Sequence, residues 1–570
     1  MPILVQASRR ARRDATDSAN APVTAVKVRK ENDLTLHYLF TIRLDGGRKH
    51  RVLVSQIEPL GNIAKVVGSV SEDIPRAPAE AKSRIEEILA AAPAETFIGV
   101  EQPGFKNGTA FIADGIRRGH EYNRYLWLTP SACSTPQAAG SFSGWQECVA
   151  LPCRESSYLA FALMTGLAGP LLHWANLPEG AAFHLYGDSS TGKSTTARVA
   201  ASITGAPGNH SNWGRSARRL TETAAEHRDQ ALILDAAEKA KRQDVKEILQ
   251  AITHGLVEGG GKVYAASVQA SLPDLTSRSP ILSNGNRSGA ELARIAGLPW
   301  DEQEAARFIS IPVPKRAQGG VIDLPSSTDP HHSAHLINML EKGLKRHHGR
   351  VLGRWLTLVW KHRERVNGLI ANFVSLAQPN DAYERRIARK FGLIYAAGMI
   401  GVRTGFLPWE AGLPNEVVLK LYHGARAAMQ VGCAREAIVA LAEALNDAAM
   451  FPDIGTAKEL ILDHDAAMVG FRFSKAGDEF VAIRQDGLGA LLDKTAEPEA
   501  LISALAEAGV IELGHGGRRG KQLHVQLINR ANGRIIVKPR CLVMKAAPLA
   551  AFIEAAGRGR RGDDDAIVVV

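Results

Sequence analysis

The sequence predicts a chain of several domains arranged around an α/β core. Its 570 residues are enough for about three to four domains of ordinary size. A short apolar strand, a glycine-rich loop and a helix follow one another within residues 182–201, and this order is typical of α/β proteins. Hydrophobic residues make up 45% of the chain and charged residues 22%, which is the balance of a globular protein with an apolar core.

The N-terminal third differs from this core. Residues 1–30 are basic and polar, and they predict a disordered tail. Residues 31–153 predict an α+β accessory domain. Leu34 to Leu44 alternate between apolar and polar residues as a strand does, and Asp45-Gly46-Gly47 is a hairpin turn signal. The composition of Pro78 to Ala91 predicts a helix in the same domain.

The core is expected over residues 154–330. Residues 331–450 predict successive amphipathic helices, from His335 to Lys345, Val351 to Asn367 and Ala382 to Gly401. Residues 451–556 combine helices with short strands. A helix followed there by a hairpin with a Gly- and Arg-rich tip resembles a winged helix, so a winged-helix-like α+β domain is expected. Residues 557–570 are of low complexity and predict a second disordered tail.

The glycine-rich loop has the spacing of a phosphate-binding loop. Between Gly187 and Ser194 it reads Gly-x-x-x-x-Gly-Lys-Ser. Glycines let the backbone wrap closely around phosphate oxygens, and amides at the following helix start attract the anion. Lys193 is expected to bind the β- and γ-phosphates, and Ser194 to bind Mg²⁺. The sequence thus predicts a P-loop NTPase core that binds ATP through Gly187, Asp188, Ser189, Ser190, Thr191, Gly192, Lys193, Ser194 and Thr195.

A second acidic group for Mg²⁺ is expected at Asp235. It follows four apolar residues, Ala231 to Leu234, which predict a buried strand. Enzymes that hydrolyse nucleotides in this way usually carry a glutamate directly after this aspartate, to polarise the attacking water. Ala236 stands there instead. Three alternatives follow: Glu238 takes over this role, another group handles the water, or hydrolysis is weak.

Two further catalytic positions are predicted downstream. Asn284 ends a third apolar segment and is expected to sense the γ-phosphate or the lytic water, with Ser283 and Asn286 as rivals. Arg307 opens another apolar segment. In ring ATPases an arginine there often reaches the γ-phosphate of a neighbouring subunit. Arg294 is the second candidate for this contact with the γ-phosphate. The alternative is that Arg307 is a surface arginine without a catalytic role.

The charge of the chain suits a polyanionic partner. Its net charge is +10. Residues 1–30 contribute half of it, with seven Lys or Arg against two Asp. Lys262 follows three glycines between the Asp235 strand and the Asn284 strand, where ring helicases often carry a DNA-gripping hairpin. The second group of candidate nucleic-acid contacts is Arg518, Arg519 and Lys521 at the hairpin tip. For both groups, a flexible solvated turn is the alternative.

Other classes of site and location are not supported. The five cysteines are scattered without a Cys-x-x-Cys pair or a Cys/His cluster, so neither zinc nor a disulfide framework is expected. Scattered cysteines without a disulfide framework are typical of proteins in a reducing compartment, so a cytoplasmic location is expected. Tyr158 to Ala175 is short for a membrane span and contains three Gly or Pro residues. It is expected to be a buried helix, and no membrane association is expected.

Taken together, these residues resemble the bacterial family called domain of unknown function 927, whose members are labelled superfamily II helicase and inactivated derivatives. The resemblance spans roughly residues 35 to 330. It is carried by Ser143-Gly144-Trp145-Gln146, His184 to Thr196, Trp213, Leu232 to Asp235, Gly261-Lys262 and Arg307 to Pro312. It implies similarity to replication-type ring ATPases of phages, plasmids and integrated elements, hence a homo-oligomeric ring acting on DNA. The family tends to have glutamate where Ala236 stands.

The leading hypothesis is an ATP-dependent DNA-handling motor, a replication-type helicase of a mobile genetic element that uses ATP and Mg²⁺. One alternative is a low-turnover ATP-binding switch, or an inactivated helicase derivative, that assembles on DNA. Another is a small-molecule kinase that uses the same loop. A kinase should also show an acceptor pocket and an arginine-bearing lid, and neither is readable in the sequence.

Overall fold

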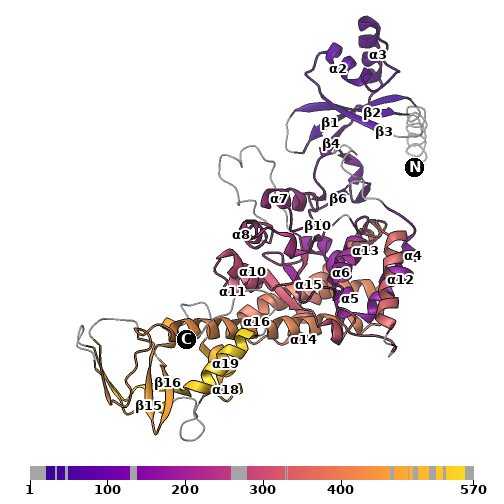
Figure 1. Ribbon diagram of the computed structural model, residues 1–570. Coiled ribbons are helices and arrows are strands. Elements are labelled where there is room, and N and C mark those ends of the chain that lie inside the picture. The colour runs from indigo at the N-terminus through magenta and orange to yellow at the C-terminus, as the bar shows by residue number, and fades with distance from the viewer. Residues whose placement is uncertain are drawn as a thin grey trace. The chain divides into compact units, whose positions relative to one another are not determined.

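The computed structural model (Figure 1) describes residues 21–31, 35–44, 49–113, 115–128, 138–208, 210–257, 279–327, 329, 331–462, 468–485, 487–491, 498–511, 521–529 and 535–558. The chain divides into two compact units. The first comprises residues 1–286 and 313–420, and the second comprises residues 287–312 and 421–570. Each unit is considered separately below.

The first unit begins with a five-stranded mixed sheet in the order β3-β2-β1-β4-β8. One face is covered by two helices, because apolar side chains of both pack against Phe40 and Ile42. The alternating strand and the helix predicted for this domain are both present. The disordered tail predicted over residues 1–30 is wrong for residues 23–30, because they form β1, which pairs with β2 and β4 and buries Val23, Ala25 and Val28. The elements are β1 (Val23–Lys30), β2 (Leu36–Arg43), β3 (Lys49–Ser55), α2 (Leu60–Gly68), α3 (Pro78–Ala90), β4 (Thr96–Val100) and β8 (Tyr125–Trp127).

A small antiparallel sheet lies between β4 and β8 in the sequence. It consists of β5 (Gly104–Lys106), β6 (Ala110–Ala113) and β7 (Ile116–Gly119) in that order. Phe105 joins it to the core, because its ring stacks on His173 with centroids 4.0 Å apart. Its N–H also donates to Asp229 over 2.8 Å.

The core of the first unit contains a parallel sheet in the order β10-β11-β12-β9. Every residue of α5 is buried, and Phe161 on this helix packs against Phe183 and Phe391. The apolar stretch is therefore interior, as predicted, and no helix of the described residues is long and apolar enough to cross a membrane. The elements are α4 (Phe142–Trp145), α5 (Ser157–Ala168), β9 (Ala182–Tyr186), α6 (Lys193–Ala201), β10 (Ser211–Asn212), α7 (Ala217–Ala225), β11 (Leu232–Asp235), α8 (Arg242–Gln250) and β12 (Ile281–Gly285).

A helical region follows, as predicted, with α12 (His332–Arg346), α13 (Leu352–His362), α14 (Val366–Ala377), α15 (Ala382–Arg403) and α16 (Leu413–Leu445). The single helix expected from Val351 to Asn367 is wrong, because a 3₁₀ turn over residues 363–365 separates α13 from α14. Arg363 donates to the carbonyl of Trp360 over 2.7 Å. A side chain thus satisfies a carbonyl near the end of α13.

In the second unit, α10 (Gly289–Ala296), α11 (Glu302–Arg307) and β13 (Phe308–Pro312) precede a C-terminal α+β region. Arg307 ends a helix, so the expected strand begins one residue later. The C-terminal sheets have the orders β15-β16-β20-β17 and β14-β18-β19. Their elements are β14 (Glu459–Leu462), β15 (Gly470–Lys475), β16 (Asp478–Arg484), α17 (Leu488–Leu491), α18 (Pro498–Glu507), β17 (Lys521–Gln522), β18 (Gln526–Asn529), β19 (Ile535–Val537), β20 (Arg540–Lys545) and α19 (Ala546–Arg558).

A buried ion network anchors the chain just before β9. Both carboxylate oxygens of Glu179 accept from Arg386 on α15, over 2.7 and 2.8 Å. Lys390 of the same helix lies 2.6 Å from Glu179. Burial alone would raise the pKa of Glu179, but the hydrogen bonds from Arg386 and Lys390 outweigh it and hold the pKa at about 2. The carboxylate is therefore charged at neutral pH.

We expect Glu179→Ala to destabilise the first unit by about 3 to 5 kcal/mol, because the ammonium group of Lys390, only 2% exposed, would lose its counter-charge. The melting temperature measured by circular dichroism reports this loss. In the wild type, this stabilisation is present above pH 4.5 and is lost as the pH falls toward 2, since folding depresses the pKa of Glu179 from 4.5 to about 2. Glu364→Ala, at an 88% exposed site, is the control and should melt like the wild type. Equal melting temperatures for both variants would contradict the network's role.

Candidate nucleotide-binding site

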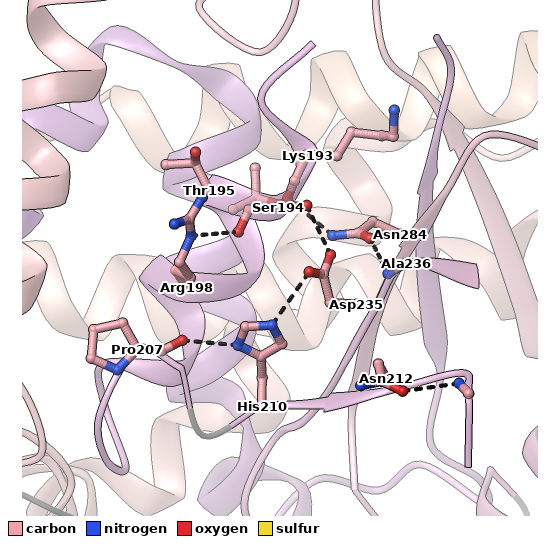
Figure 2. Close-up of polar contacts among 12 residues, drawn as sticks. Lys193, Ser194, Thr195, Arg198, Pro207, His210, Asn212, Asp235, Ala236 and Asn284 are labelled. Atoms are coloured by element: carbon pink, nitrogen blue, oxygen red, sulfur yellow. Dashed lines mark hydrogen bonds and ion pairs between the residues drawn. The ribbon is translucent and has the colours of Figure 1, made fainter. Parts of the chain in front are cut away.

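The carboxyl ends of parallel strands place the predicted site residues together. β9 ends at Tyr186, directly before the glycine-rich loop, and β11 ends at Asp235. β12 carries Asn284 next to its last residue. Because these strands are parallel, the loop, Asp235 and Asn284 meet at one edge of the sheet. Figure 2 shows these side chains converging at the start of α6.

The loop closes against a later segment of the first unit through Gly192. This residue has φ 97° and stands directly before α6. A Cβ atom there would lie 2.5 Å from the side chain of Val321. The N–H of Val321 also donates to the carbonyl of Thr191 over 2.9 Å. Glycine is therefore required both by the backbone conformation and by the close packing of Val321.

Lys193 turns its amine into the loop. Its Nζ donates to the carbonyls of Gly187 and Asp188 over 2.8 and 2.5 Å, and lies 3.3 Å from the hydroxyl of Thr191. The residue is only 7% exposed. Burial lowers the pKa of Lys193, against the opposing effect of nearby carboxylates, of which Glu238 acts most strongly. The loop thus holds a cation on neutral oxygen acceptors.

Asp235 is held by Ser194 at the start of α6, by His210 before β10 and by Asn284 on β12. Ser194 donates to its Oδ1 over 3.1 Å, and Nε2 of His210 lies 3.3 Å from its Oδ2. Burial alone would raise the pKa of Asp235, but hydrogen bonds from His210, Asn284 and Ser194 outweigh burial and lower it. Figure 2 shows Ser194 and His210 approaching the carboxylate from opposite sides. The arrangement keeps an anion beside the hydroxyl predicted to bind Mg²⁺.

His210 is a site residue that the sequence interpretation missed. It lies between α6 and β10, and its ring is fixed by a 2.8 Å contact between Nδ1 and the carbonyl of Pro207. His210 belongs to no motif of fixed spacing with the loop or with Asp235. A proline three residues before a histidine is too weak a pattern to identify such a contact from one sequence.

Asn284 also bonds the backbone on both sides of the site. Its Oδ1 accepts from the N–H of Ala236 over 2.8 Å, and its Nδ2 donates to the carbonyl of Lys193 over 3.0 Å. The side chain is 3% exposed. Asn284 therefore ties the end of β11 to the start of α6. This brace fixes the two halves of the site relative to each other.

The position after Asp235 has an unusual backbone. Ala236 is buried and has φ 60°, in the left-handed region. Glu238 follows on a short 3₁₀ turn, Ala237–Lys239, and is exposed. The carboxylate of Glu238 is close enough to influence the pKa of Lys193. Glu238 therefore lies near the loop, as a substitute for the missing glutamate would have to.

The rival and remaining candidates fall elsewhere. Ser283 is buried, and its hydroxyl lies 3.0 Å from both His184 Nδ1 and Trp213 Nε1, so it belongs to a network inside the sheet. Thr195 and Arg198 on α6 contact Glu341 of α12. Arg294 and Arg307 belong to the second unit and stay predictions, as does Asn286. Lys521 lies in β17, whereas Lys262, Arg518 and Arg519 lie outside the described residues.

The residues at the loop fit a nucleotide with Mg²⁺. Lys193 supplies a buried cation for phosphate. Ser194 is an exposed residue whose hydroxyl lies next to an ionised carboxylate, and these two oxygen groups suit Mg²⁺. Within the part of the chain that the structure describes, no group of three or more His, Cys, Asp or Glu side chains is placed to hold a metal by itself.

We expect Asn284→Ala to lower the stability of the ligand-free protein by about 1 to 3 kcal/mol, because a buried N–H and a buried carbonyl would lose their partner. The melting temperature without nucleotide measures this effect. Asn62→Ala serves as the control, since the Asn62 side chain bonds Glu58 at an exposed position and the loss of this bond should be neutral. An unchanged melting temperature for Asn284→Ala would show that Asn284 is no brace.

Comparisons with known proteins agree with the fold described above. One solved structure, described as "SCCmec type IV Cch - active helicase", is 14% identical and has a TM-score of 0.60. The match covers 94% of this chain and 95% of that chain, so the two share a fold. A search among curated proteins gave no match. Residues 78–268 match the family model "Domain of unknown function (DUF927)", a shorter stretch than the residues 35 to 330 expected. Residues 78–268, with the loop, His210, Asp235 and Glu238, are therefore a DUF927 domain, which confirms the resemblance seen in the sequence.

Proposed function

We propose that this chain is an ATP-dependent DNA-handling motor, a replication-type helicase of a mobile genetic element. The observation that carries the proposal is the meeting of Lys193, Ser194 and Asp235 at the carboxyl edge of a parallel sheet. A solved structure described as an active helicase has the same fold. We further propose that the protein acts in the cytoplasm as a homo-oligomeric ring on DNA.

In this proposal the loop amides and Lys193 bind the phosphates. The amine of Lys193 exchanges its contacts with the carbonyls of Gly187 and Asp188 for phosphate oxygens, which are stronger acceptors because they are charged. Ser194 and Asp235 would hold Mg²⁺, which offsets charge on the β- and γ-phosphates when bound. His210 keeps the Asp235 carboxylate in place from the side opposite Ser194.

We propose Glu238 as the group that orients and deprotonates the attacking water. It is exposed, it follows Asp235 closely, and its charge acts on Lys193. Asn284 is less suited to contact the γ-phosphate directly, because its Oδ1 and Nδ2 both bond backbone groups. Its proposed contribution is to hold α6 and Asp235 in register.

A second function is favoured by Ala236. The usual glutamate is absent, and a larger residue at this buried position with φ 60° would be strained. This observation supports a low-turnover ATP-binding switch, or an inactivated helicase derivative, that assembles on DNA. ATP turnover by the wild type, measured with and without single-stranded DNA, separates the two proposals, because a motor should be stimulated by DNA.

We expect Lys193→Ala to reduce ATP turnover at least about 100-fold, because the site loses the cation that binds the β- and γ-phosphates. Turnover and nucleotide affinity are measured together, and circular dichroism checks the fold. Lys239→Ala removes an exposed lysine on the nearby 3₁₀ turn and should retain wild-type turnover. Undiminished turnover in a folded Lys193→Ala protein would disprove the NTPase proposal.

We expect Glu238→Gln to lower ATP turnover by about 10² to 10⁴-fold while leaving ATP affinity nearly unchanged, because a general base acts mainly in the transition state. Single-turnover kinetics and equilibrium nucleotide binding measure the two effects. Glu247→Gln, an exposed site on α8, is the matched control.

If the protein is a slow switch, wild-type turnover is already low and Glu238→Gln changes little. Fast ATP hydrolysis by the wild type that is unchanged in Glu238→Gln would contradict both proposals, the general base at Glu238 and the slow switch. Another residue would then have to activate the attacking water.

A further inference from the structure

A cleft of about 570 Å³ lies in the first unit, away from the nucleotide loop in sequence. One wall is formed by β7 and its flanking residues, from Gly115 to His120 together with Tyr122, and the other by residues 356–361 of α13. Arg118 fixes the two walls together, because its Nε donates to the carbonyl of Gly353 over 3.2 Å. A smaller cleft of about 200 Å³ shares Gly115 and Arg117 with it and extends toward Arg51.

The cleft lining is cationic. Arg117, Arg118 and Lys361 line the larger cleft together with His120, and Arg51 lines the smaller one. No Asp or Glu lines either cleft among the described residues. The three guanidinium groups donate to backbone carbonyls of Trp127, Tyr125, Gly353 and Arg117. Carbonyl partners hold these guanidinium groups without neutralising their charge.

Aromatic rings lie among these charges. Tyr122 is 47% exposed on the turn after β7, and Trp360 lines the opposite wall. Trp360 reaches the strand because residue 119 is glycine: a Cβ atom there would lie 2.9 Å from its ring and 2.5 Å from the carbonyl of Thr109. The ring of Trp360 is also supported by Trp174, with centroids 5.6 Å apart. The wall is therefore a fixed platform next to an exposed ring.

From this geometry we propose that the cleft binds a segment of single-stranded DNA, a proposal that rests on the proposed function for its choice of DNA. Arg117 and Lys361 bind backbone phosphates, and Tyr122 and Trp360 stack on bases. Aromatic rings that line a cationic groove are the combination that single-stranded nucleic acids recognise, because phosphates need charge and unpaired bases need a flat apolar surface. An acidic peptide or free phosphate would use the charges and leave the rings unused.

The test uses the full chain and a fluorescent 20-nucleotide oligo-dT, with affinity measured by anisotropy over a range of salt concentrations. Arg117→Gln with Lys361→Gln removes two charges from the cleft. Lys342→Gln with Lys345→Gln removes two exposed charges from α12 and is the matched control. Tyr122→Ala, a third variant, removes one exposed ring without a change of charge.

We expect the cleft double variant to bind oligo-dT at least about tenfold more weakly than the control at moderate salt, with a salt slope lower by about 1.4. Tyr122→Ala should weaken binding at least about fivefold with an unchanged slope. DNA-free ATP turnover should stay at the wild-type value in all three variants, because none of these residues belongs to the nucleotide site.

Equal affinities of the cleft and control double variants would overturn the proposal, as would equal binding of oligo-dT and a 20-base-pair duplex. Tighter binding of oligo-rU than of oligo-dT would overturn the assignment to DNA. An absence of ATP turnover in the wild type would refute the motor and leave the cleft assignment to be decided by the binding data alone.

Discussion

The candidate nucleotide site depends on keeping one buried carboxylate charged. Asp235 is 7% exposed, and burial of a lone carboxylate would favour its neutral form. Ser194, His210 and Asn284 oppose this effect, and each comes from a different segment. Asp235 therefore keeps its charge only when three segments are in place: α6, β12 and the segment that precedes β10. A site built in this way assembles only when the whole sheet edge has formed.

A second group of polar side chains lies behind this edge, in the interior of the sheet. Ser283 neighbours Asn284 on β12 and joins His184 to Trp213. All three residues are buried, so their hydrogen bonds fix the register between β12, β9 and the segment after β10. Because side chains alternate along a strand, Asn284 faces the loop while Ser283 faces this network. Strand β12 therefore contributes Asn284 to the candidate site and Ser283 to the buried network behind it.

The sequence was sufficient for the parts of the site that have fixed spacing. The loop, Asp235 and the buried helix α5 follow from local patterns, and each lies where it was predicted. His210 and the cationic cleft could not be predicted, because they depend on contacts between distant segments, such as that of Arg118 with Gly353. The break between α13 and α14 was missed because the amphipathic pattern continues across it. The roles of Glu238 and Arg307 stay predictions, because a role in catalysis is not readable from a position.

Glycine is used in a comparable way at the nucleotide loop and at the cleft. Gly192 admits the side chain of Val321 against the loop, and Gly119 admits the ring of Trp360 against β7. Both have positive φ values, 97° and 103°, so a side chain at either position would strain the backbone and displace its neighbour. The neighbour is apolar in each case and supports a surface that presents positive charge. Removing water from beneath a cation strengthens its attraction to an anion, because the local dielectric constant falls. Close packing behind the charged groups is therefore part of how each surface would bind a phosphate, and neither the lysine of the loop nor the arginines of the cleft would suffice on a loosely packed support.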